Sequence, residues 1–185
     1  MGQAKGDLDP ETTSRLICLV RHGKAAPKNV GLSDLERSLV PEGIAESARV
    51  ARSLTAKRMS FDLLLSSPAD RALETAHIFA EYLGYPILKI QIVPALYEDS
   101  SPAGLIAAVK KIDDRIQRIA LFGHNPHFAG LATHLIPELD REIAKGGAMG
   151  ISTKIKSWSQ LRKGCGHFEF YVDPEHATAK VGARL

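Results

Sequence analysis

The sequence predicts an α/β fold, a three-layer α/β/α sandwich with a mostly parallel central sheet. Short apolar runs alternate along the chain with longer segments of helical periodicity, which is typical of parallel sheets covered by helices. The first run, residues 16–20, is continuously apolar and ends abruptly at Arg21, His22 and Gly23. An apolar run this short, stopped by a glycine, indicates a strand that is buried on both faces.

The remaining elements follow in chain order. Pro41 opens a helix, because a proline costs little in the first turn, where its N–H would have no intrahelical partner. Gly84 marks the end of the next helix. We expect further strands at residues 61–65, 87–93 and 119–122, helices at 41–54, 69–83, 102–111 and 127–135, and two late strands that could form a hairpin at 147–155 and 165–172. The loop over residues 24–40 is long for a connection from strand to helix, and long ordered loops are often functional.

The composition is that of an ordinary globular protein, with 44% hydrophobic and 24% charged residues in a chain of 185. We expect one domain over residues 15–185, preceded by a disordered tail at residues 1–14, which is polar and lacks periodicity. No apolar run reaches the roughly 18 residues of a membrane span, and the acidic N-terminus does not resemble a secretory signal. With two cysteines and no disulfide pattern, the sequence predicts a cytoplasmic protein that does not bind a membrane.

The surplus of positive charge is small, a net +3, and is spread along the chain. The densest basic stretch is Lys154, Lys156, Arg162 and Lys163, around Trp158. Nucleic-acid-binding patches are more densely clustered than this, so the stretch is better interpreted as a solvated face of a hairpin. We therefore expect no nucleic-acid partner.

Polar residues follow three of the predicted strands. The first strand is followed by Arg21 and His22, the second by Ser66, Ser67 and Arg71, and a later one by His124 and Asn125. Because parallel strands end at one edge of the sheet, these side chains should converge in one crevice. Two guanidinium groups there would suit a tetrahedral dianion, and a neutral imidazole can attack phosphorus.

The motifs at these positions resemble a known family. They are Arg21-His22-Gly23, Ser66-Ser67-Pro68-x-x-Arg71-Ala72-x-x-Thr75-Ala76, Leu96-Tyr97-Glu98 and Gly123-His124-Asn125-Pro126. In this order and at these strand ends they resemble the histidine phosphatase (phosphoglycerate mutase-like) superfamily. The stretch Asp34-Leu35-Glu36-Arg37-Ser38-Leu39, followed by Gly43, resembles more narrowly the SixA-type phosphohistidine phosphatases. The resemblance extends over most of the chain, from about residue 15 to residue 152.

The resemblance implies a phosphatase that needs no cofactor and no metal. His22 would attack phosphorus and become phosphohistidine, which water then hydrolyses. Arg21, Arg71 and a protonated His124 would offset the charge of the phosphoryl oxygens, and Glu98 would protonate the leaving atom. The implied phosphate-binding residues are Arg21, Gly23, Arg71, His124 and Asn125.

Three functions fit these residues. The favoured one is dephosphorylation of phosphohistidine on a protein, because no insertion is long enough to form a large lid over the site. The first alternative is hydrolysis of a small phosphate ester by the same fold. The second is a phosphoprotein-binding module without turnover, which would need neither His22 nor Glu98. Lys28 stands where mutase-like members often have Asn, six residues after the nucleophile, which disfavours a mutase-type pocket.

Two further patterns have more than one interpretation. Asp34 and Arg37 match the family pattern, and they could form either a local salt bridge or a substrate contact. His124, His127 and His134 could suggest a metal site, but the neighbouring Phe128, Leu131 and Leu135 indicate a packed helix instead.

Overall fold

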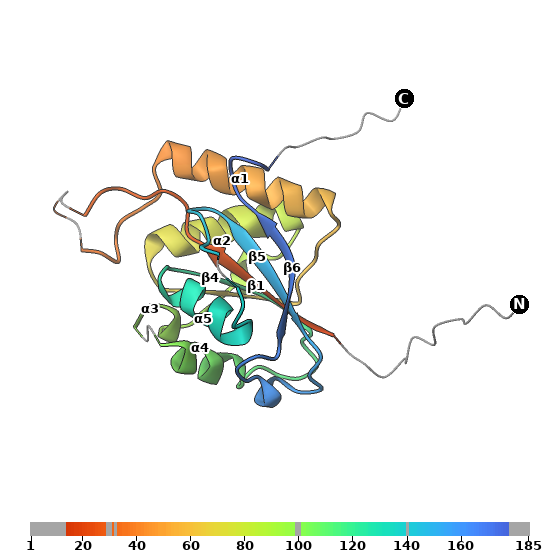
Figure 1. Ribbon diagram of the computed structural model, residues 1–185. Helices are drawn as coiled ribbons and strands as arrows, with labels where there is room; N and C mark the ends of the chain where they lie inside the picture. Colours follow the sequence, from red (N-terminus) through yellow and green to blue (C-terminus); the bar gives the residue numbers. More distant parts are fainter. Residues whose placement is uncertain (1–13, 29–30, 32, 99–100, 140, 178–185) are drawn as a thin grey trace, which may run out of the picture.

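A six-stranded sheet forms the centre of the structure, and helices cover both of its faces (Figure 1). The computed structural model describes residues 14–28, 31, 33–98, 101–139 and 141–177. The strands are β1 (Arg15–Arg21), β2 (Leu63–Ser66), β3 (Gln91–Ile92), β4 (Arg118–Gly123), β5 (Ala148–Thr153) and β6 (Gly166–Val172), in the spatial order β3-β2-β4-β1-β5-β6. Strands β1 to β4 are parallel, and β5 is antiparallel to both of its neighbours. The predicted fold class is confirmed.

The helices form two layers. On one face lie α1 (Pro41–Ala56) and α2 (Asp70–Leu83), and on the other α3 (Ala95–Glu98), α4 (Pro102–Val109) and α5 (His127–Leu135) (Figure 1). Two short 3-10 helices, η1 (Ile87–Lys89) and η2 (Trp158–Gln160), lie in the connections. As predicted, α1 begins with Pro41, and α2 ends at Gly84, whose φ of 66° is in the left-handed region.

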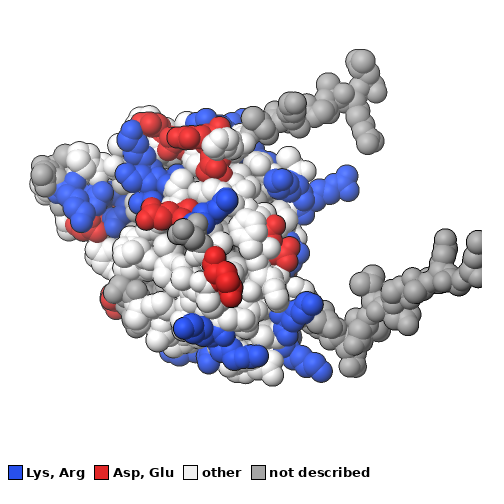
Figure 2. Space-filling model, viewed as in Figure 1, with Lys and Arg blue, Asp and Glu red and all other residues white. Residues whose placement is uncertain are grey.

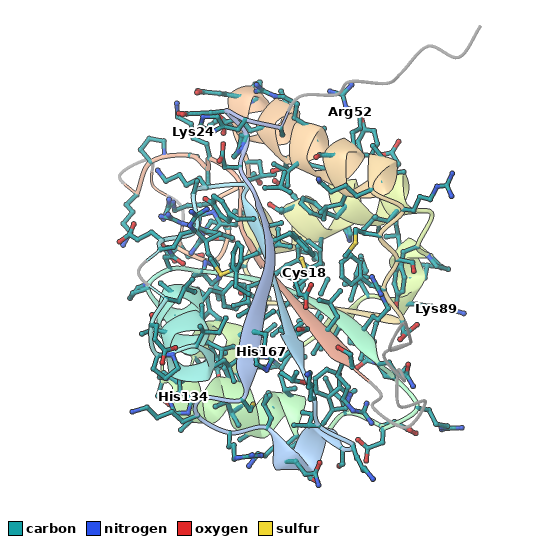
Figure 3. All side chains as sticks on the ribbon, turned by 45° about the vertical axis from the view of Figure 1, so that its right-hand side comes forward. Cys18, Lys24, Arg52, Lys89, His134 and His167 are labelled. Carbon is teal, nitrogen blue, oxygen red and sulfur yellow. The ribbon has the colours of Figure 1, made fainter. Side chains whose placement is uncertain are left out.

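The central strand β1 divides the core in two. Its side chains alternate, so that Cys18 and Val20 pack on the side of α1 and α2, whereas Ile17 and Leu19 pack on the side of α4 and α5. Figure 3 shows Cys18 between the two helical layers. Because both faces of β1 are covered, its carboxyl end is held rigidly, and that end carries Arg21 and His22.

The prediction of a strand over residues 87–93 is wrong. Residues Ile87–Lys89 form η1, and only Gln91 and Ile92 pair with β2, opposite Leu65 and Ser66. The two late strands do pair antiparallel, but η2 interrupts the connection between them. The predicted tail lies almost wholly outside the described residues. Within the part of the chain that is described, no helix combines the length and the apolarity needed to cross a membrane.

Candidate active site

Three loops meet at the carboxyl-terminal edge of the parallel strands, where ligands bind in open α/β sheets. β1 leads into His22, β2 into Ser67 and β4 into His124. Backbone hydrogen bonds join these loops: His22 N donates to Gly123 O at 3.0 Å, and Ser67 N donates to Phe122 O at 2.9 Å. The polar strand ends that the sequence predicts to converge therefore lie side by side.

His22 is held in one tautomer. Its Nδ1 lies 2.7 Å from the carbonyl oxygen of Gly23. A carbonyl can only accept, so Nδ1 carries the proton and Nε2 keeps its lone pair. Burial lowers the pKa of His22 to about 4; the hydrogen bond to Gly23 opposes this shift, and the charges of Arg71, Arg21 and Arg37 add to it. At neutral pH the ring is therefore a neutral imidazole with Nε2 available as a nucleophile.

His124 faces His22, with 5.0 Å between the ring centroids. Its Nε2 lies 2.8 Å from Ser67 Oγ, and among the described residues its buried Nδ1 has no hydrogen-bond partner. Burial, together with the charges of His22 and Arg71, lowers the pKa of His124 to about 3, and the charge of Asp34 opposes this shift. At neutral pH His124 is therefore a neutral imidazole in this structure, and its protonation beside a bound phosphoryl group stays a prediction.

Arg71, in the first turn of α2, contacts a carboxylate. Its Nη2 donates to Asp34 Oδ2 at 2.8 Å, and its Nη1 donates to the Asp34 carbonyl oxygen. Asp34 Oδ1 accepts from Arg37 Nη1 at 2.6 Å. Asp34 and Arg37 thus form the local salt bridge that the sequence left open, and the same carboxylate reaches Arg71.

Arg21 and Asn125 are anchored by one carbonyl group. Arg21 Nη1 donates to Ile143 O at 2.9 Å, and Asn125 Nδ2 donates to the same oxygen at 3.2 Å. Burial lowers the pKa of Arg21, while the charge of Glu142 raises it. This shared carbonyl fixes Arg21, the last residue of β1, and Asn125, which follows β4, relative to each other.

A hydroxyl group links the His22 loop to α2. Thr75 Oγ1 accepts from Gly23 N at 3.1 Å and donates to the Arg71 carbonyl oxygen at 2.7 Å. The loop also lies close to α1: a Cβ atom on Gly23 would lie 2.7 Å from the carbonyl oxygen of Gly43. Gly23 is therefore required by this close approach of two backbones.

Part of the chain matches a known family. The family model of the histidine phosphatase superfamily (branch 1) matches residues 17–101, slightly less than half of the sequence. The matched segment includes His22, Arg71 and Glu98. This similarity supports a hydrolase of the phosphatase class.

Relatives and solved structures are similar over a larger share of the chain. An uncharacterised protein of Mycobacterium tuberculosis is 26% identical over 160 residues, which cover 79% of this chain and 94% of the relative. The putative phosphohistidine phosphatase SixA from Nakamurella multipartitia has a TM-score of 0.75 at 19% identity, covering 87% of this chain and 96% of that one. A structure of the protein histidine phosphatase SixA complexed with tungstate has a TM-score of 0.72 at 22% identity, covering 88% and 99%. At these identities, the structural matches are likenesses of fold.

In this structure, α3 brings Tyr97 rather than Glu98 to the predicted site. Tyr97 OH donates to Asp34 Oδ2 at 3.0 Å, and its ring packs edge-on against His124 at 5.6 Å between centroids. Glu98 is exposed, and no hydrogen bond or ion pair among the described residues joins its carboxylate to His22 or Arg71. The role of Glu98 in protonating the leaving atom stays a prediction.

The other histidines do not join this site as a metal cluster. Figure 3 shows His134 and His167 in the lower half of the molecule, far from Lys24, which closely follows His22 in the chain. Within the described ranges, no group of three or more His, Cys, Asp or Glu side chains is arranged to hold a metal ion.

Proposed function

We propose that this protein removes phosphoryl groups from phosphohistidine residues of other proteins, through a covalent intermediate on Nε2 of His22. The observation that carries this proposal is the state of His22: its Nδ1 is fixed by Gly23 O, and its low pKa keeps Nε2 unprotonated. Arg21 and Arg71 lie at the same edge of the sheet and could bind the oxygens of a phosphoryl group.

The proposed reaction has two steps. In the first, the lone pair of Nε2 forms a bond to phosphorus while the bond from phosphorus to the leaving nitrogen breaks, and the leaving imidazole takes up a proton. In the second, water attacks the phosphoryl group, the bond from phosphorus to Nε2 breaks, and the attacking water loses a proton. One water is consumed, and inorganic phosphate and a histidine side chain are released.

Charge stabilisation in both steps would come from side chains. Arg21 and Arg71 are cations that can offset the negative charge of the phosphoryl oxygens in the transition state. A bound dianion would also raise the pKa of His124 again, because an opposite charge favours the protonated form of an imidazole. Its buried Nδ1, which has no partner among the described residues, would then be a donor to the same group. No metal is needed in this scheme.

A protein substrate is favoured because the long loop after β1 is held against α2. In this β1–α1 loop (residues 22–40), Leu39 N donates to Glu74 Oε2 at 2.6 Å, and Leu35 O accepts from Asp70 N at 2.9 Å. These contacts keep the described part of the loop against the helix, so a side chain carried by another protein could approach His22. The fold likeness to SixA, described as a protein histidine phosphatase, supports the same choice.

The test is a single-turnover reaction with a ³²P-phosphohistidine protein and with 4-nitrophenyl phosphate. We expect wild type to release phosphate, the His22→Ala variant to be inactive on both, and faster turnover of the phosphohistidine protein. His167→Ala, which changes an exposed histidine on β6, is the matched control and should react like wild type. EDTA should leave the rates unchanged.

Two other outcomes would indicate a different function. A faster reaction with the aryl phosphate would favour a small-molecule phosphatase. Binding of phosphate without any turnover by wild type would replace the enzyme with a phosphoprotein-binding module.

A further inference from the structure

The proposed phosphoryl-transfer scheme leaves one charged side chain of the site without a function, the carboxylate of Asp34. It comes from the β1–α1 loop and accepts hydrogen bonds from three side chains: Arg37 Nη1 at 2.6 Å, Arg71 Nη2 at 2.8 Å and Tyr97 OH at 3.0 Å. These donors belong to the loop, to α2 and to α3. A carboxylate beside the arginine of an anion site repels the anion, so its placement calls for a reason other than phosphate binding.

Asp34 is ionised in this position. Partial burial favours the neutral carboxyl group, but the hydrogen bonds from Arg37, Arg71 and Tyr97 outweigh it and hold the pKa of Asp34 well below its usual range. Its charge also reaches His124, whose pKa it raises. Asp34 therefore places a negative charge beside Arg71, one of the predicted phosphate-binding residues.

The Asp34 side chain is more exposed to solvent than the two arginine side chains that bind it. The side chain of Asp34 is 37% exposed, compared with 13% for Arg37 and 6% for Arg71. Figure 2 shows basic side chains gathered over the projecting loop at the left of the molecule, so the surroundings would otherwise attract anions. If Arg71 binds the phosphoryl group of a substrate, the solvent-facing remainder of that substrate would lie against the Asp34 carboxylate.

We propose that Asp34 selects the leaving group: it favours phosphorylated groups that carry a neutral N–H or a positive charge beyond the phosphoryl group, and disfavours those that carry a second anion. This inference rests on the proposed function. An N–H or ammonium group can donate to the exposed carboxylate, whereas a second carboxylate or phosphate would lie within a few ångströms of it. Arg37 cannot reverse this preference while its charge is paired with Asp34.

The test compares two substrates that have the same leaving group, an imidazole, but side arms of opposite charge. N-Phosphohistamine and N-phospho-3-(imidazol-4-yl)propionate both release an imidazole, but the first has an ammonium side arm and the second a carboxylate. We expect wild type to have the higher kcat/KM for phosphohistamine. Asp34→Asn should lower the ratio of the two values on the order of tenfold, because it removes the negative charge and leaves that of Arg37 unpaired.

Two controls distinguish selection of the leaving group by Asp34 from a structural role and from a general effect of charge in the loop. Asn can still accept from Arg71, and the Asp34 carbonyl oxygen still accepts from Nη1, so a merely structural role would change both rates alike and leave the ratio unchanged. Glu36→Gln removes one charge from the same loop, where Glu36 binds Ser33, and should not change the ratio.

Three results would overturn the inference. An unchanged ratio in Asp34→Asn, or an equal change in Glu36→Gln, means that Asp34 does not select the leaving group, although the phosphatase activity stands. If wild type dephosphorylates the phosphohistidine protein but hydrolyses neither compound, the inference fails and the proposed function stands. If it hydrolyses none of the three substrates, both fail.

Discussion

The chemistry of this site depends on which nitrogen of His22 carries the proton. Gly23 O accepts from Nδ1, and burial disfavours a second proton on the ring. The neighbouring imidazole of His124, 5.0 Å away, is kept neutral by the same cause. Both imidazoles stay neutral mainly because their partial or full removal from water disfavours the charged form, and the charge of Arg71 adds to this effect. The result is a nucleophile that needs no general base to activate it.

The titration of His22 tests this account. With a pKa of about 4, His22 should stay neutral as the pH falls from about 8 to about 5, whereas an ordinary histidine would be mostly protonated below about pH 6. The measurement is an NMR titration of the His22 Cε1–H signal, assigned by its loss in His22→Ala. The same signal in urea-unfolded protein serves as the reference and should titrate near an ordinary value. A midpoint above about pH 6 in the folded protein would contradict the account.

At this scale the sequence indicated most of the site but not its charge balance. Arg21, His22, Arg71 and His124 were recognisable because each follows a strand at the same edge of the sheet. The contact of Tyr97 with Asp34 joins residues 63 positions apart, and no local pattern reports it. On a helix, successive side chains point about 100° apart, so α3 cannot turn both Tyr97 and Glu98 toward His124.

At the scale of elements, local patterns succeeded where an element's own sequence decides its form. Helix α1 begins at Pro41 as predicted, and α2 ends at Gly84. Most of the strand expected over residues 87–93 does not form, because strand pairing depends on the length of the neighbouring strand β2. β2 has only four residues, Leu63–Ser66, and offers only Leu65 and Ser66 to β3, so the residues before Gln91 turn into η1 instead.

The link between β1 and α2 leads to a prediction about Thr75. Thr75→Val keeps the shape of the side chain but leaves the N–H of Gly23 without its acceptor in a buried position. We expect a loss of about 1–3 kcal/mol in the free energy of unfolding, the usual cost of an unmatched buried polar group. Because Gly23 O orients His22, kcat should fall more than the affinity for inorganic phosphate. Urea denaturation and steady-state kinetics measure the two effects.

The conservative variant Thr75→Ser provides the control. It keeps the hydroxyl that bridges Gly23 N and Arg71 O, and should restore most of kcat. If Thr75→Val lowers stability but leaves kcat unchanged, Thr75 does not position His22. An equal loss of kcat in both variants would mean that the hydroxyl alone is not sufficient to position His22.

At the scale of the whole molecule, the site makes folding sensitive to acid. Folding takes two imidazoles, His22 and His124, out of water and pairs neither with an anion in the described structure, so the native state resists their protonation. The unfolded chain has no such restriction. Between the ordinary histidine pKa and the lowered values of about 4 and about 3, the unfolded state therefore binds more protons than the native state.

The free energy of unfolding therefore decreases as the pH falls. The contribution of the two neutral histidines is fully present above the unfolded pKa of about 6.5. It is lost below that pH, by up to about 1.4 kcal/mol per pH unit for each histidine. From about pH 7 to about pH 5 we expect a decrease of a few kcal/mol in the free energy of unfolding, measured by urea denaturation. Asp34 does not contribute in this window, because its pKa is lowered from an already acidic value.

Two variants test whether these histidines cause the pH dependence. His124→Gln, which can still hydrogen-bond Ser67, should reduce the slope of the unfolding free energy against pH by about half, and His22→Asn should do the same. Parallel curves for wild type and both variants would show that other groups carry the acid sensitivity.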